Sequence, residues 1–126
     1  MGQLTTYQNY IDGQWSDSVS GETYTITNPA HKSQVLGRFQ RSNNEDAVRA
    51  IEAARNALDG WASTPAPQRA AILFKALQLM EARGDELARS ITIEEGKPIG
   101  DAMGEVKRSM NITEYAAGEG RRRFGY

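Results

Sequence analysis

The residues Gly96-Lys97-Pro98 constrain the fold of this chain more than any other feature, because they end one helix and start another. After them, apolar or small residues recur at intervals of three and four positions, at Ile99, Met103, Val106, Met110, Thr113 and Ala117. This spacing is typical of one face of an amphipathic helix, so we predict a long helix over residues 98–122. Glu105 and Arg108 are three residues apart and share a face beside that stripe.

Three further helices are predicted before this turn. The first covers residues 44–62, capped by Ser42 or Asn43. The second follows Thr64 as its cap, with Pro65 at the first helical position, and the third is capped by Asp85 and ends at Gly96. Each helix carries an apolar stripe that we expect to be buried. The stripes comprise Ala47, Val48, Ile51, Ala54, Leu58 and Trp61; Ile72, Leu73, Ala76, Leu77 and Met80; and Leu87, Ala88, Ile91 and Ile93.

The first forty residues have the features of β-structure. Asp12-Gly13 fits a two-residue hairpin turn, since both positions tolerate positive φ. The run 24–27 is β-branched and aromatic, and the segment 35–40 alternates, so both are predicted strands. Residues 1–8 show no periodicity, and we expect them to be disordered. The predicted fold class is therefore α+β, with short strands within residues 9–40 and about four helices within residues 44–122.

Composition limits the class of protein. Leu, Ile, Val and Phe supply only 22 of 126 residues while alanine supplies 16, so we expect a thin core and a chain that is one domain or a piece of a larger one. A net charge of −1 gives no reason to expect nucleic acid or an anionic membrane as partner. The absence of cysteine excludes a thiolate nucleophile within these residues. No apolar run is long enough for a membrane span or signal peptide, so we expect a cytoplasmic protein.

Three motifs make the chain recognisable: Asn28-Pro29-Ala30, the segment 61–69 and the segment 94–118. Their order across residues 10–125 resembles the first part of an NAD(P)-dependent aldehyde dehydrogenase. The resemblance implies that residues 9–126 are the N-terminal part of the cofactor-binding domain of an α/β enzyme that oxidises an aldehyde to the acid. It also implies a homo-oligomer with a small-molecule aldehyde as substrate.

The same resemblance assigns the catalytic cysteine, the glutamate base and the residues that hold NAD or NADP to sequence beyond Tyr126. We therefore expect no catalytic and no cofactor-binding residue in this chain, no cofactor binding by the chain alone, and no activity. The alternative is a free-standing helical interaction module that binds a partner protein through its apolar stripes.

Two sets of site residues follow from the resemblance. The segment 105–109 is similar to branches that act on aldehydes carrying an acid or phosphate group, including 2-oxoglutarate-semialdehyde and non-phosphorylating glyceraldehyde-3-phosphate dehydrogenases. In those branches an arginine matching Arg108 holds the anion of the substrate, which suits a bidentate guanidinium. The alternative role for Arg108 is a salt bridge to Glu105 or Asp101 on the same helix. The resemblance also implies a monovalent-cation site, formed by the Glu94 side chain and by backbone carbonyls at the positions of Ile26 and Thr27. The alternative is that Glu94 is simply solvated, as adjacent acidic residues at a helix end usually are.

Four other candidate sites are better explained without ligands. His31, the single histidine, has no second ligand nearby and is expected at the surface. Gly96-Lys97 lacks the earlier glycine and the following Ser or Thr of a phosphate loop. Gly118-Glu119-Gly120 lies late in a helix, whereas a dinucleotide fingerprint lies between a strand and a helix start. The run 121–123 of arginines complements the dipole at a helix C-terminus.

Overall fold

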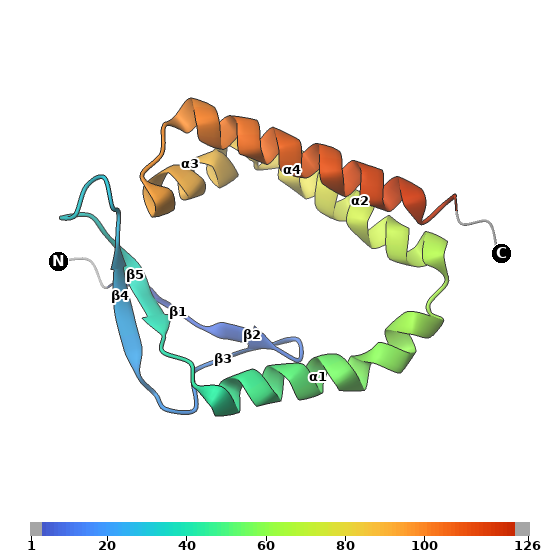
Figure 1. Ribbon diagram of the computed structural model, residues 1–126, viewed down its shortest axis with the longest axis horizontal. Helices are drawn as coiled ribbons and strands as arrows, with labels where there is room; N and C mark the ends of the chain where they lie inside the picture. Colours follow the sequence, from blue (N-terminus) through green and yellow to red (C-terminus); the bar gives the residue numbers. More distant parts are fainter. Residues whose placement is uncertain (1–3, 123–126) are drawn as a thin grey trace. The chain divides into compact units, whose positions relative to one another are not determined.

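The computed structural model describes residues 4–122, in which short strands are followed by four helices (Figure 1). The strands are β1 (Thr6–Tyr7), β2 (Asn9–Ile11), β3 (Gln14–Ser16), β4 (Thr23–Thr27) and β5 (Val35–Gln40). The helices are α1 (Asn44–Ser63), α2 (Ala66–Ala82), α3 (Gly84–Glu95) and α4 (Ile99–Glu119). This order confirms the predicted α+β class. The chain divides into two compact units, residues 1–61 and 62–126.

The first unit contains a three-stranded sheet in the order β1-β5-β4 and a separate hairpin of β2 and β3. In the hairpin turn Asp12 and Gly13 have φ of 53° and 74°, which confirms the predicted turn. β4 is antiparallel to β5, whereas β1 is parallel to it. The predicted disorder of residues 1–8 is wrong for Thr6–Tyr7, because these residues pair with β5 and the Tyr7 ring stacks on Phe39 with centroids 4.8 Å apart. Residues 1–3 lie outside the described residues.

Asn43 is the cap of α1, one of the two predicted candidates. Its Oδ1 accepts hydrogen bonds from the backbone N–H groups of Glu45 (2.8 Å) and Asp46 (3.3 Å). The Asp46 carboxylate in turn accepts a hydrogen bond from the Asn43 N–H at 3.0 Å. This reciprocal arrangement satisfies backbone donors that the first turn of a helix leaves unpaired.

Asp46 also ties the loop before β4 to the start of α1. It is 3% exposed and accepts hydrogen bonds from the Ser18 hydroxyl (2.7 Å) and the Val19 N–H (2.9 Å). The backbone N–H groups of Asn43 and Val19, followed by the Ser18 hydroxyl, lower the pKa of Asp46. All these donors stabilise the ionised carboxylate, so this contact depends on its charge.

The predicted burial of the apolar stripes is wrong for most of their large members. On α1, Ile51 is 66% exposed and Leu58 58% exposed, and on α2 Ile72 is 57% exposed. Periodicity shows which face of a helix needs a cover, but it does not show which residues supply that cover. Within the described residues these faces remain open.

The core of the second unit is built almost wholly from alanine. α2 and α3 pack against α4 (Figure 1). The buried apolar residues of this unit are Ala70, Ala88, Ala102, Val106 and Ala117. Leu87, Ile91 and Met110 pack partly buried against them. Small side chains at a helix contact permit a short distance between the helix axes, and this core therefore depends on close approach of backbones.

Gly120 shows how close that approach is. It follows the last residue of α4, and a Cβ placed on it would lie 2.7 Å from the Ala70 Cβ and 3.1 Å from the Ala66 carbonyl oxygen. Real carbon contacts lie at about 3.5–4.0 Å. A glycine is therefore required where the end of α4 meets α2, while Gly118 has open space around its Cβ position.

Three predicted helix ends are wrong in detail. Pro65, not Thr64, is the N-cap of α2, and Arg83, not Asp85, is the N-cap of α3. Arg83 ends α2 as well, so the two helices share one capping residue and leave no room for a separate cap. α4 ends at Glu119, whereas the prediction extended to residue 122. No helix of the described part combines the length and the apolar character that crossing a bilayer requires.

Candidate functional site

The turn between α3 and α4 forms as the sequence predicts. Gly96 caps α3 with a left-handed conformation (φ 75°), and its N–H donates to the Thr92 carbonyl at 2.8 Å. A side chain at this φ would be strained, which explains the glycine. Pro98 is the N-cap of α4, so the chain reverses within three residues. The turn places Lys97 beside both helices.

Lys97 joins the end of α3 to the second turn of α4. Its Nζ lies 2.7 Å from the Glu95 Oε2 and 2.5 Å from the Glu105 Oε1. The hydrogen bonds to Glu105 and then to Glu95 raise the pKa of Lys97 to about 12. The Lys97 side chain is 25% exposed, less than either carboxylate. Sequence reasoning missed this cluster, because helical spacing rules do not relate a turn residue to positions on two helices.

Arg108 lies on α4, three residues after Glu105, with an exposed side chain. Within residues 4–122 its guanidinium forms no hydrogen bond or ion pair. The alternative role predicted for it, a salt bridge to Glu105 or Asp101, is not formed there, since Glu105 is held by Lys97. The arginine is therefore available to an external anion.

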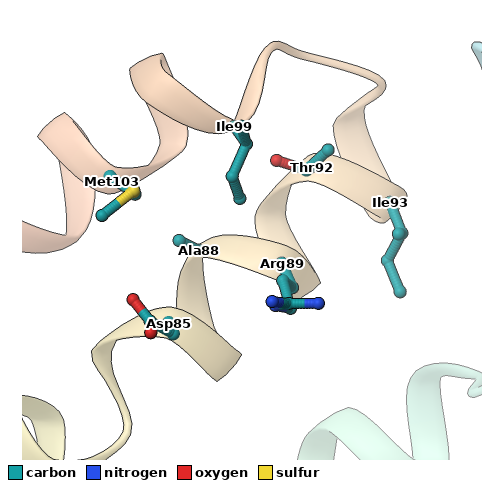
Figure 2. Close-up of a pocket in the computed structure, with 7 residues that line it drawn as sticks. All are labelled: Asp85, Ala88, Arg89, Thr92, Ile93, Ile99 and Met103. Atoms are coloured by element: carbon teal, nitrogen blue, oxygen red, sulfur yellow. The ribbon is translucent and has the colours of Figure 1, made fainter.

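A groove of about 460 Å³ lies between α3 and the start of α4 (Figure 2). Its lining is mixed, with apolar side chains from both helices and two charged ones from α3. The lining residues are Asp85, Ala88, Arg89, Thr92, Ile93, Ile99 and Met103. The Thr92 hydroxyl oxygen is buried without a hydrogen-bond partner in the described structure. The lining of this groove contains neither cysteine nor histidine.

The predicted cation-site residues are distributed over both units. Ile26 and Thr27 lie in β4 of the first unit, and Glu94 lies exposed near the end of α3 in the second. Among residues 4–122 there is no cluster of three or more His, Asp or Glu side chains able to hold a metal. The cation site remains a prediction. His31 lies exposed in the loop between β4 and β5, as expected.

The two described arginines that follow α4 make contacts within their own unit. The Arg121 guanidinium lies 5.6 Å from the centre of the Phe74 ring, and Arg122 forms an ion pair with Glu119. Arg123 lies outside the described residues. The neighbouring Gly120 contacts α2, and Gly118 lies inside α4, whereas a dinucleotide fingerprint lies between a strand and a helix start.

The family profile of the aldehyde dehydrogenases matches residues 15–125 of this chain. The chain belongs to the aldehyde dehydrogenase family. This result confirms the resemblance seen in the sequence.

Two relatives of this aldehyde dehydrogenase chain are semialdehyde dehydrogenases by name. It is 45% identical over 108 residues to the alpha-ketoglutarate semialdehyde dehydrogenase of Haloferax volcanii, covering 86% of this chain and 22% of that protein. It is 45% identical over 115 residues to malonate-semialdehyde dehydrogenase 1 of Geobacillus thermodenitrificans, covering 91% and 24%.

Among solved structures, an NAD-dependent aldehyde dehydrogenase from Sinorhizobium meliloti superposes with a TM-score of 0.90 at 34% identity, covering 98% of this chain and 25% of that one. The chain thus spans about a quarter of the length of the relatives it matches.

Proposed function

We propose that this chain is the N-terminal portion of an NAD(P)-dependent aldehyde dehydrogenase that oxidises an acidic semialdehyde to the carboxylic acid. The exposed Arg108, with no partner in the described residues, is the observation that carries this proposal. The names of the semialdehyde dehydrogenases to which the chain is 45% identical support it. We expect the enzyme to be a cytoplasmic homo-oligomer.

The role of this segment is substrate selection and scaffolding. It has no cysteine, and its described residues form no strand–glycine–helix cradle for NAD(P). As the family resemblance implies, we expect the nucleophile, the base and the cofactor site in the remaining sequence of the enzyme. Arg108 supplies a fixed positive charge with two parallel donors, which matches the geometry of a carboxylate.

The size of the effect follows from the chemistry of the pair. Hydrogen bonds to charged groups contribute about 1.5–3 kcal/mol. Since 1.4 kcal/mol is a factor of ten, loss of the arginine should reduce kcat/KM for an acidic semialdehyde by about ten- to hundredfold. An uncharged aldehyde makes no such pair, so its kcat/KM should not change.

The test is Arg108→Met in the enzyme that carries this segment, assayed with an acidic semialdehyde and with an uncharged aldehyde of similar size. Lys107→Met is the matched control, because it removes an adjacent positive charge about 100° around the helix. Only Arg108→Met should penalise the acidic substrate selectively. Equal losses with both substrates would make Arg108 structural, and the acidic substrate would have to be abandoned.

A free-standing interaction module is the second candidate function, and the open apolar face of α1 favours it. Ile51 and Leu58 on that face are more than half exposed. Reading the encoding gene past Tyr126 separates the two. An in-frame continuation with a cysteine and glycine-rich cofactor motifs supports the enzyme, whereas a stop codon supports the module.

A further inference from the structure

Glu105 and Arg108 are natural partners that the structure keeps apart. Residues three apart on a helix are neighbours on its surface, and an acid and an arginine at this spacing commonly pair. Instead, the Glu105 carboxylate lies 2.5 Å from the Lys97 Nζ. The carboxylate is half exposed, so without Lys97 it would be accessible to the Arg108 guanidinium along the surface of the helix.

Lys97 is well placed to hold Glu105. It approaches from the turn before α4, and its ammonium also lies 2.7 Å from Glu95 at the end of α3. A lysine between two carboxylates stays charged, because both favour its ammonium form. Pairing with Lys97 also reduces the negative charge one helical turn from Arg108, which would otherwise disfavour an approaching anion more strongly.

We propose that Lys97 is a positioning residue for anionic-substrate recognition, which holds Glu105 so that the Arg108 guanidinium stays open to the carboxylate of a semialdehyde. This inference rests on the proposed function of Arg108. In this role Lys97 touches no substrate and acts through Glu105, whose carboxylate would otherwise compete with the substrate for Arg108. The cluster lies wholly within the second unit, on α3, the turn and α4.

The expected effect is a change in apparent affinity. In the enzyme carrying this segment, Lys97→Met frees Glu105 to pair with Arg108, and the substrate must then compete with it. Exposed ion pairs of this kind correspond to about 1.5- to 5-fold in an equilibrium constant. The KM for an acidic semialdehyde should rise by that factor with kcat unchanged, whereas the KM for an uncharged aldehyde of similar size should stay constant.

The double variant Lys97→Met/Glu105→Gln decides between positioning and a merely structural role. It lacks the same lysine contacts in the turn, but it has no carboxylate to compete for Arg108. We expect the double variant to restore the wild-type KM for the acidic substrate. Lys97→Arg keeps the pair with Glu105 and should also have the wild-type KM. Thermal unfolding by circular dichroism checks that the variants are folded to the same extent.

Two results would overturn the inference: an equal rise in KM for the single and double variants, or no rise for Lys97→Met. Arg108→Met, measured alongside, separates this failure from that of the proposed function. If Arg108→Met loses the acidic substrate while Lys97→Met does not, the proposed function stands and the positioning role falls. If Arg108→Met leaves the preference between substrates unchanged, the proposed function itself fails.

Discussion

Two glycines at the end of α4 provide a test of the alanine-lined packing in the second unit. Gly118→Ala places a methyl group in open space, whereas Gly120→Ala places one 2.7 Å from the Ala70 Cβ. Both substitutions reduce the conformational freedom of the unfolded chain, which stabilises the folded state by roughly 0.4–1 kcal/mol. The two variants share that contribution, so their difference reports the steric term alone.

The steric term should be large, because the Ala66 carbonyl oxygen, part of the backbone of α2, lies 3.1 Å from the same position. α2 and the end of α4 must move apart, and overpacking of this kind costs about 1–3 kcal/mol. Gly118→Ala should therefore raise the midpoint of thermal unfolding. The midpoint of Gly120→Ala should lie below that of Gly118→Ala, by about 4–8 °C for each kcal/mol of steric cost.

The assay is thermal unfolding of the purified chain followed by far-ultraviolet circular dichroism, with urea unfolding to give the free-energy difference. Hydrogen exchange at the start of α2 adds a local readout, since amides near Ala70 should exchange faster in Gly120→Ala. If the two variants unfold at the same temperature, α4 does not approach α2 closely at Gly120, and this core is not packed as described.

Three further outcomes are expected. Because the pKa of Asp46 is lowered from its ordinary value of 3.8, its contribution to stability is present above about pH 4 and is lost as pH falls through the lowered pKa. Asp46→Asn should thus be less stable than wild type at pH 7, and the difference between their urea midpoints should narrow below pH 4. A difference that does not depend on pH would contradict the role of the charged Asp46 carboxylate in its hydrogen bonds. The isolated chain should bind a hydrophobic dye or self-associate through its exposed stripe on α1, and Ile51→Lys/Leu58→Lys should reduce both in fluorescence and light scattering. A monomeric, dye-silent wild type would count against this. Incubated with aldehydes and NAD(P)+, the chain alone should form no reduced cofactor, and turnover in proportion to protein concentration would disprove that.

Local signals in the sequence predicted the main elements because each acts over a few residues. Asp12-Gly13 specifies its hairpin, and Gly96 ends α3 through a conformation that suits glycine. β1 was missed because it is two residues long and exists through pairing with β5, about thirty residues further along the chain. No periodicity can show such a strand.

The candidate site was predictable only in part. The position of Arg108 on α4 beside Glu105 follows from helical spacing, and its proposed role came from resemblance. The pairing of Lys97 with Glu95 and Glu105 could not be predicted, because it depends on how a turn directs one side chain toward two helices. The same limit applies to Gly120, where the neighbour that requires a glycine lies on another helix.

The alanine-lined core also determines which substitutions the second unit tolerates. In most cores the damaging changes are truncations, which leave voids. Ala70, Ala88, Ala102 and Ala117 have only a methyl group to lose, so truncation there removes little. Enlargement at the same positions forces whole helices apart, because a backbone cannot change rotamer to make room. Larger side chains at these alanines should therefore destabilise the second unit more than truncations do, because the small residues set the distance between its helices.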